Sequence, residues 1–173
     1  MVVTQARQFK NFEAYLAAPL SELPEGRFEY WNGALVPVMS ESGFNAFLAN
    51  CLFVALVNAG VPIALLRPHS CEVEVPGQPR TRFPDLTVLD DVHVPLIAQR
   101  ERVTREMPPP RLLVEVVSPG DENSENYKRD YEDKCKQYAA LGVPEYWLID
   151  PERKRVLVGG AGGAGLSVSR VSG

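Results

Sequence analysis

The sequence contains few cysteines and histidines, on which disulfide-rich and zinc-binding small proteins depend. Its 173 residues include only 3 cysteines and 2 histidines. Cys51, Cys71 and Cys135 are odd in number and show no CxxC spacing, which argues against a disulfide framework or a cysteine zinc site. His69 and His93 are too few for a histidine-rich metal centre. A chain of this length can fold around an ordinary apolar core without such supports.

Long apolar runs and an excess of positive charge are missing as well. The main apolar runs, 52–59 and 112–117, are far shorter than the ~20 residues of a membrane span. The N-terminus lacks the apolar core of a signal peptide, so we expect a soluble, cytoplasmic protein with no membrane partner. The net charge of −4 gives no overall footprint of a nucleic-acid binder. Binding to DNA would therefore require a local group of basic residues, or a metal ion at the phosphate.

Apolar patterns and turn residues predict a mixed domain of helices and strands. The Asn32-Gly33 pair is the strongest hairpin signal, because both turn positions require positive φ. A 3.6-residue apolar period indicates a long, largely buried helix between Phe44 and Gly60, and a second helix covers about 125–141. Strands are expected at 28–31, 34–38, 63–67, 71–75, 83–89, 111–117, 145–150 and 155–158. The order predicts an α/β (α+β) fold with a mixed central sheet flanked by helices and an N-terminal hairpin.

The composition changes near the C-terminal end of the chain. Residues 1–158 have the apolar content and turn spacing of a single domain. Residues 159–173, GGAGGAGLSVSRVSG, are rich in glycine and low in complexity. We expect them to form a flexible tail.

Glu115 is the first residue that breaks an apolar pattern. It lies inside Leu-Leu-Val-Glu-Val-Val at 112–117, a stretch apolar enough to be buried on both faces of a sheet. A carboxylate there is costly unless it is paired, protonated or bound to a cation. Glu115 therefore either has a chemical task, or lies near the exposed end of its strand or beside an arginine.

Two further residues are anomalous in the same sense. Asp85 follows Pro84 at the start of an apolar strand, where proline is tolerated, although the same pair also fits an ordinary turn. On a wheel of 125–141, Lys134 falls within the apolar stripe between Tyr131 and Tyr138. A buried lysine needs an anionic partner or a task, unless its amine reaches water at the edge of the domain.

Together these three residues suggest metal-assisted hydrolysis of a phosphodiester. Asp85 and Glu115 offer hard oxygen ligands that suit Mg²⁺ or Mn²⁺, and the carbonyl of Val116 could add another. Lys134 could orient or deprotonate a water molecule and stabilise charge on a phosphate.

Several stretches then resemble one known family in order and spacing. They are FEYWNGAL, FPDLTVLDD, LLVEVVSPG, KCKQYAALGVPEYWLIDP and RVLV. The chain to about residue 158 resembles the restriction endonuclease family formerly known as a domain of unknown function, within the PD-(D/E)XK nuclease superfamily. The resemblance implies a restriction-endonuclease-like core and a divalent-metal-dependent endonuclease acting on DNA, without an organic cofactor. It also implies a homodimer, since members of the superfamily commonly dimerise.

The resemblance also implies which residues form the site. Val117 stands where the superfamily has its strand lysine, and in this family a lysine on the following helix is thought to substitute, which matches Lys134. Glu29 matches an acidic residue of the early hairpin that would complete the metal site. Basic residues that could follow the DNA backbone, or could simply form a solvated surface, are Arg100, Arg102, Arg105, Lys128 and Arg129.

The chain departs from the family pattern in two places. The family often has a histidine at the start of its long helix, where this chain has Ser-Gly-Phe-Asn at 42–45, so a contribution of that helix to the site is in doubt. Members usually continue into another strand pair after the segment equivalent to 155–158, whereas here the glycine-rich tail follows. The edge of the sheet is then either incomplete or covered by a partner subunit.

Two other functions fit parts of the sequence. The first is a catalytically inactive nuclease-like module that binds nucleic acid or a protein, which the net acidity and the missing histidine favour. The presence of Asp85, Glu115 and Lys134 argues against it. The second is a serine hydrolase that uses Ser118, but the chain lacks the G-x-S-x-G turn of such enzymes.

Overall fold

A six-stranded mixed sheet forms the centre of the molecule. The computed structural model describes residues 8–39, 42–160 and 167–170. Strand order is β11-β10-β9-β8-β6-β3, and only the β8–β9 pair is parallel. The strands span Leu66–Pro68 (β3), Leu86–Val88 (β6), Leu112–Val116 (β8), Glu145–Asp150 (β9), Arg155–Gly159 (β10) and Ser167–Arg170 (β11). A helical crossover joins the two parallel strands, as parallel pairing requires.

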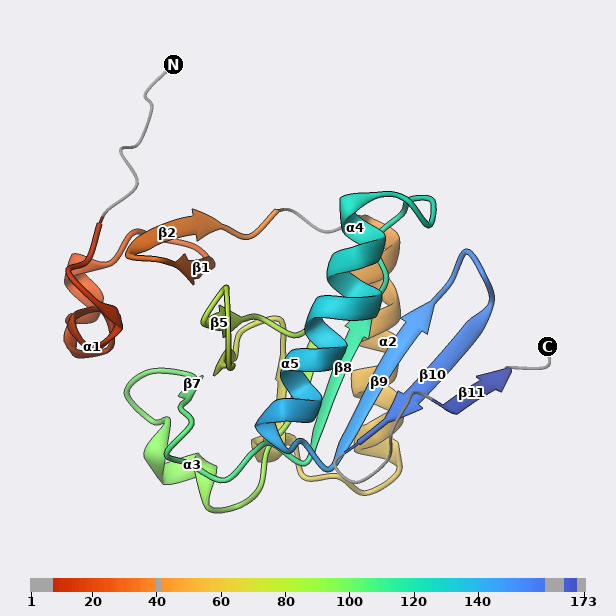
Figure 1. Cartoon of the computed structure of the whole chain (residues 1–173). Coiled ribbons are helices and arrows are strands. Elements are labelled where there is room, and N and C mark those ends of the chain that lie inside the picture. Colours follow the sequence, from red (N-terminus) through yellow and green to blue (C-terminus); the bar gives the residue numbers. More distant parts are fainter. Residues whose placement is uncertain (1–7, 40–41, 161–166, 171–173) are drawn as a thin grey trace.

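Helices cover both faces of this sheet (Figure 1). Helix α2 (Gly43–Asn58) lies on one face; α4 (Glu125–Lys128), a π-helical segment η3 (Arg129–Asp133) and α5 (Lys134–Leu141) continue one another on the opposite face. Alternate residues of β8 serve the two layers: Leu113 packs with Tyr138 of α5, whereas Val114 packs with the α2 side. The same alternation turns Glu115 toward α5.

An N-terminal unit packs against a second, three-stranded sheet. The unit comprises α1 (Phe12–Ala17), a 3₁₀ turn η1 (Leu20–Glu22) and a hairpin of β1 (Phe28–Trp31) and β2 (Ala34–Pro37). The hairpin turn has positive φ at Asn32 and Gly33, as the sequence predicts. The second sheet has the order β5-β4-β7, formed by Thr81–Arg82 (β5), Glu72–Glu74 (β4) and Arg102–Val103 (β7). Two further short helical elements among the described residues are η2 (Ile63–Leu65) and α3 (His93–Leu96).

The predicted fold class is confirmed, and three details differ from expectation. Strand β4 is buried along its length rather than half-exposed, because the N-terminal unit covers it, and arginines pair with its buried glutamates. Helix α2 is not largely buried, since Phe44 and Phe47 are 58% and 60% exposed on its outer side. In the predicted tail, Ser167–Arg170 forms β11 along β10, while 161–166 and 171–173 lie outside the described residues. No described helix combines the length and apolar character that crossing a membrane requires.

Candidate active site

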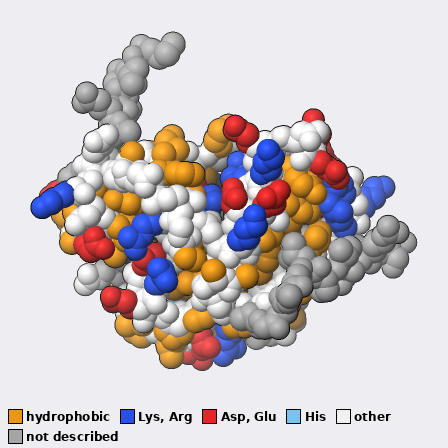
Figure 2. Space-filling view, viewed as in Figure 1, with side chains coloured by type: hydrophobic (Ala, Val, Ile, Leu, Met, Phe, Trp, Pro, Cys, Tyr) orange, Lys and Arg blue, Asp and Glu red, His pale blue; other side chains and the backbone are white. Residues whose placement is uncertain are grey.

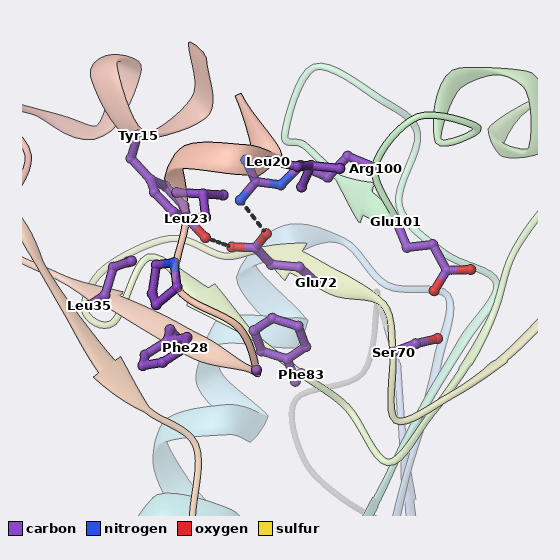
Figure 3. A pocket seen from close by; sticks show the side chains of 12 residues that line it. Tyr15, Leu20, Leu23, Phe28, Leu35, Ser70, Glu72, Phe83, Arg100 and Glu101 are labelled. Atoms are coloured by element: carbon purple, nitrogen blue, oxygen red, sulfur yellow. Dashed lines mark hydrogen bonds and ion pairs between the residues drawn. The ribbon is translucent and has the colours of Figure 1, made fainter. Parts of the chain in front are cut away.

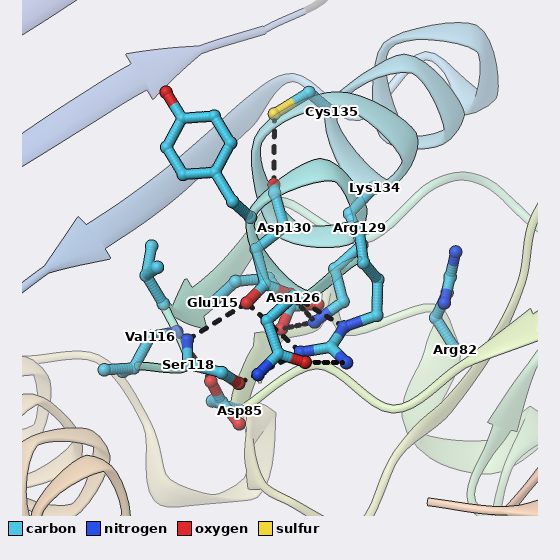
Figure 4. A network of polar contacts seen from close by, with 12 residues as sticks. Arg82, Asp85, Glu115, Val116, Ser118, Asn126, Arg129, Asp130, Lys134 and Cys135 are labelled. Atoms are coloured by element: carbon cyan, nitrogen blue, oxygen red, sulfur yellow. Dashed lines mark hydrogen bonds and ion pairs between the residues drawn. The ribbon is translucent and has the colours of Figure 1, made fainter. Parts of the chain in front are cut away.

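Glu115 lies at the centre of a buried polar cluster between β8 and α5. Its side chain is 1% exposed. The Tyr138 hydroxyl donates to Glu115 Oε1 at 2.5 Å, and Lys134 Nζ donates to Oε2 at 2.6 Å. The sequence expectation that Lys134 approaches Glu115 is therefore met. Both oxygens are bonded, so the orientation of the carboxylate is fixed from two sides. Figure 4 shows Glu115 beside Lys134.

The same lysine binds a second buried carboxylate. Lys134 Nζ lies 3.0 Å from Asp130 Oδ1, and Asp130 is also 1% exposed. The π-helical turn that begins at Arg129 changes the phase of the helix between Asp130 and the residues after it. Such turns are frequent at functional sites. Here the turn accompanies two inward-facing charged residues on the same helix, Asp130 and Lys134, of which the sequence reasoning identified only the lysine.

Burial and mutual attraction set the charges in this cluster. Burial raises the pKa of Glu115, although Lys134 opposes that shift. Burial also disfavours the charged form of Lys134, but the carboxylates of Glu115, Asp130 and Asp85 outweigh it and raise the pKa of the amine. For Asp130, Lys134 and Arg129 overcome the effect of burial and lower the pKa. Lys134 is therefore a cation at neutral pH.

Asp85 comes to the cluster from the strand beside β8. It precedes β6 directly, and its Oδ2 accepts from the backbone N–H of Val116 at 2.6 Å. The proline before it suits the start of a strand, where its missing N–H costs no ladder hydrogen bond. His69 Nδ1 lies 3.8 Å from Asp85 Oδ1. The structure thus brings the Asp85 carboxylate against the residue that follows Glu115.

Helix α2 contributes to the site in spite of lacking a histidine at its start. The buried Asn45 donates from Nδ2 to the carbonyls of Val117 at 3.1 Å and Val116 at 3.4 Å. Ser42 caps the helix by accepting from the backbone N–H of Asn45. The first turn of α2 therefore fixes the end of β8, which carries Glu115.

Arg129 closes one side of the cluster (Figure 4). Its guanidinium bonds Asp130 Oδ1 at 3.1 Å, Ser118 Oγ at 3.0 Å and Asn126 Oδ1 at 3.0 Å. The backbone N–H of Ser118 also donates to Asp130, at 3.0 Å. The backbone N–H of Ser118 therefore binds Asp130, and its hydroxyl accepts from Arg129 rather than bonding to a histidine. Below, the Glu115 cluster means Asp85, Glu115, Arg129, Asp130, Lys134 and Tyr138.

Glu29 is held by a different arginine. Arg82 is 2% exposed and donates from Nη1 to both Glu29 oxygens, at 3.1 and 3.2 Å. Its Nε donates to Gln137 Oε1 at 2.9 Å, which ties the hairpin to α5. Arg82 thus holds the Glu29 carboxylate between the hairpin and α5, and the role of Glu29 as a metal ligand stays a prediction.

The predicted basic residues divide into two groups. Arg129 belongs to the Glu115 cluster, and Lys128 is exposed beside it on α4. Arg100 and Arg102 instead pair with Glu72 of β4, at 3.3 and 2.6 Å, and Arg102 is only 5% exposed. Arg105 is exposed, and its backbone N–H bonds Glu74. Figure 2 shows acidic and basic side chains gathered over α4 and α5, with apolar side chains around them.

The donor chemistry of the cluster suits a hard divalent cation. The structure offers two buried carboxylates, Asp85 and Glu115, and the carbonyl of Val116, which are the ligand types that Mg²⁺ prefers. The ammonium of Lys134 on Glu115 shows that positive charge is accommodated here. Across the described ranges, no three or more His, Cys, Asp or Glu side chains are grouped so as to hold a metal ion. The residues therefore fit such an ion by ligand type, with two side chains and a backbone oxygen.

The chain is similar to known proteins in sequence and in fold. A model of the Uma2 family, described as "Putative restriction endonuclease", matches residues 12–171. A crystal structure described as a putative nuclease belonging to DUF820, from Anabaena variabilis ATCC 29413, matches with a TM-score of 0.58 and 18% identity. That match covers 90% of this chain and 82% of the other, and it shows a shared fold. The curated proteins contain no match to the chain. The resemblance drawn from the sequence motifs is confirmed.

Proposed function

The chain belongs to the Uma2 family, and we propose that it is a divalent-metal-dependent endonuclease that hydrolyses phosphodiester bonds of DNA. One observation carries the proposal: Lys134 Nζ lies 2.6 Å from Glu115, and Asp85 bonds the adjacent Val116. Three side chains that are distant in sequence thus converge at the ends of two neighbouring strands. Two buried carboxylates can hold the metal ion, and a lysine beside them can stabilise the phosphate, which together allow metal-assisted phosphodiester hydrolysis.

The metal ion would be Mg²⁺ or Mn²⁺, held by Asp85, Glu115 and the carbonyl of Val116. When bound, such an ion lowers the pKa of a coordinated water and neutralises charge on the phosphate. Tyr138 holds Glu115 in position through its 2.5 Å hydrogen bond. Asn45 holds the end of β8, and with it the Val116 carbonyl.

Lys134 acts as a fixed cation rather than as a base. Its amine lies 3.0 Å from Asp130, which is not among the proposed metal ligands, so a negative charge stays beside the ammonium when a metal ion is bound. A cation at this point orients the attacking water through a hydrogen bond and stabilises the negative charge that develops on the phosphate. Asp130 positions the amine from the other side at 3.0 Å, and Arg129 in turn holds Asp130.

Contacts with the DNA backbone are assigned to Lys128 and Arg129. Both lie on the first turns of the site helix, and Lys128 is exposed. Arg100 and Arg102 pair with Glu72 of β4 and not with the Glu115 cluster, so we do not assign them phosphate contacts at this site. Backbone contacts of this kind position a protein on DNA without reading its bases, and we assign no recognition sequence.

The outer side of α2 supports a homodimer. Phe44, Phe47, Cys51 and Val54 follow a three-four spacing and are exposed. No charged residue occurs over 42–66, so a surface that packs here must be apolar too, which a second copy provides. If two α2 helices cross near their middle, Cys51 should form an intermolecular disulfide under mild oxidation. A monomer by sedimentation, with no cross-link, would contradict this arrangement.

Nicking of supercoiled plasmid tests the function directly. We expect cleavage with Mg²⁺ or Mn²⁺ and none with EDTA. Calorimetry should show that Asp85→Ala and Glu115→Ala each abolish Mn²⁺ binding, whereas Arg111→Ala, a change at an exposed pair with Asp90, leaves it intact. A catalytically inactive binding module would bind DNA without nicking it, and wild-type Mn²⁺ affinity in both alanine variants would show that the assigned ligands are wrong.

A further inference from the structure

His69 lies where the chain passes from the central sheet to the second sheet, between the end of β3 at Pro68 and the start of β4 at Glu72. The next residue, Ser70, lines a half-open cavity of about 190 Å³ between the N-terminal unit and the second sheet (Figure 3). The half-buried imidazole of His69 lies instead beside the Glu115 cluster, with Nδ1 3.8 Å from Asp85 Oδ1. The function proposed above assigns no role to this side chain.

The backbone of His69 has a conformation that is uncommon for a residue other than glycine. Its φ is 56°, in the left-handed region. The other described non-glycine residues with positive φ are Asn32 and Lys154, which lie in the turns between β1 and β2 and between β9 and β10. Positive φ is usual in such turns, but His69 joins strands of two different sheets. Strained residues of this kind cluster at functional sites.

Hydrogen bonds on both sides hold His69 in this conformation. Its backbone N–H donates to the carbonyl of Asp85 at 3.0 Å, one step beyond the Pro68–Leu86 pair of the β3–β6 ladder. Its own carbonyl accepts from Arg27 Nη1 at 3.3 Å, just before β1. The conformation therefore places the imidazole of His69 beside the side chain of the residue that its backbone already pairs with.

The two oxygens of Asp85 have different surroundings. Oδ2 accepts from the backbone N–H of Val116 at 2.6 Å, whereas Oδ1 faces His69. A carboxylate anchored through one oxygen can still turn, because its terminal torsion is soft. An imidazole N–H beside the other oxygen limits this motion. The separation of 3.8 Å is longer than a hydrogen bond, and contacts of this kind often shorten when a ligand binds.

We propose that His69 is a positioning residue that holds the Oδ1 side of the Asp85 carboxylate, so that Asp85 stays directed toward Glu115. The proposal rests on the function proposed above, in which Asp85 is a metal ligand. Carboxylates that bind a metal ion are themselves held by hydrogen bonds, and loss of such an outer partner typically costs 10–100-fold in metal affinity.

Two variants of His69 separate its ring from its backbone. His69→Gly accepts the positive φ and removes the imidazole. His69→Asn also tolerates positive φ and offers an amide N–H in place of the Nδ1–H. Lys154→Gly is the matched control, because it makes the same backbone change at a φ of 49° in the turn between β9 and β10.

The first measurement requires no metal ion. The amide proton of Val116 donates to Asp85, so its chemical shift reports the orientation of that carboxylate. We expect His69→Gly to move this resonance upfield, whereas His69→Asn and Lys154→Gly leave it near its wild-type position. The asparagine variant also lacks the ring, so ring current does not explain a difference between the two. An unchanged Val116 resonance in His69→Gly would overturn the proposal.

Calorimetry with Mn²⁺ is the second measurement. His69→Gly should bind Mn²⁺ at least about tenfold more weakly than wild type, and His69→Asn should restore most of the affinity. A lower melting temperature in His69→Gly with unchanged Mn²⁺ affinity would show a structural role only and would refute the assignment. Failure of the proposed function is distinguishable, since a wild-type chain that neither binds Mn²⁺ nor nicks DNA leaves the Val116 measurement to decide the role of His69.

The wild-type chain provides a further test if His69→Gly folds poorly. The nitrogen chemical shifts of the His69 ring show which nitrogen carries the proton. A proton on Nδ1 provides the donor that faces Asp85, as we expect. A proton on Nε2 alone would leave no donor toward Asp85 and would overturn the proposal.

Discussion

Two buried glutamates, Glu115 and Glu72, have nearly the same immediate surroundings but opposite charge balances. Each lies on a strand, and each accepts a tyrosine hydroxyl on Oε1 at 2.5 Å and a basic group on Oε2 at 2.6 Å. In the Glu115 cluster three carboxylates face two cations, whereas at Glu72 two guanidinium groups face one carboxylate. The two glutamates therefore differ in the charge around them more than in their local geometry: carboxylates are in excess in the Glu115 cluster, and guanidinium groups are in excess around Glu72.

The largest expected effect comes from neutralising these two glutamates in turn. Glu72→Gln leaves Arg100 and Arg102 without a counter-charge, and breaking a buried ion pair from one side costs about 3–5 kcal/mol. Glu115→Gln should cost less, because Lys134 keeps Asp130 as a partner. Urea unfolding measures both free energies. A Glu115→Gln variant that is destabilised as much as Glu72→Gln would contradict the charge balance described above.

Removal of the lysine should separate catalysis from metal binding. Lys134→Met keeps the aliphatic chain but removes the cation, and we expect cleavage to fall by roughly 10²–10³-fold, as when an electrostatic donor is lost from an active site. Mn²⁺ affinity should not weaken, because the lost positive charge lies next to the metal-binding carboxylates. Plasmid cleavage and calorimetry on the same sample test both statements. Unchanged cleavage would eliminate the role of Lys134.

The contribution of Asp130 to the stability of the fold should depend on pH. Lys134 and Arg129 hold its pKa below the ordinary value of 3.8 in spite of burial, so its contribution to stability is present above pH 3.8 and is lost as pH falls through the folded-state pKa. Asp130→Asn should therefore be less stable than wild type by about 1.5–3 kcal/mol at neutral pH, the value of a hydrogen bond to a charged group. Unfolding measured from pH 7 to pH 2 should show the gap closing at the acidic end. A stability difference between wild type and Asp130→Asn that stays constant over this pH range would show that the ionised Asp130 does not stabilise the fold.

The smallest expected effect concerns DNA binding by the exposed Lys128. Lys128→Ala should weaken binding equally for all sequences and reduce the salt slope by about 0.9, as expected for one lost phosphate contact. Fluorescence anisotropy at several salt concentrations measures this slope. Arg111→Ala serves as the control at a distant exposed arginine. An unchanged slope for Lys128→Ala would remove this residue from the DNA surface.

Three residues of the Glu115 cluster could be singled out from the sequence because they break apolar patterns. Glu115 interrupts a buried strand, Asp85 opens another, and Lys134 lies in an apolar helix stripe. Asp130 could not be predicted in this way, because a charged residue on a helix ordinarily faces water. In addition, no pattern in the sequence predicts the π-helical turn that begins at Arg129.

The Glu72 side could not be predicted in the same way. Glu72 and Glu74 alternate with apolar residues, which is the pattern of a half-exposed strand. They are buried because the N-terminal unit, far away in sequence, covers this strand and supplies Tyr15 to Glu72. The outer side of α2 is the opposite case: its apolar period predicted burial, and the fold leaves Phe44 and Phe47 exposed.

A crystal soaked in Mn²⁺ would show directly whether Asp85 and Glu115 hold a metal ion. We expect anomalous density bound by Asp85, Glu115 and the carbonyl of Val116, at roughly 2.0–2.2 Å from their oxygens, the range of a small hard cation. Density only at surface carboxylates, or none at all beside Glu115 at saturating Mn²⁺, would contradict it.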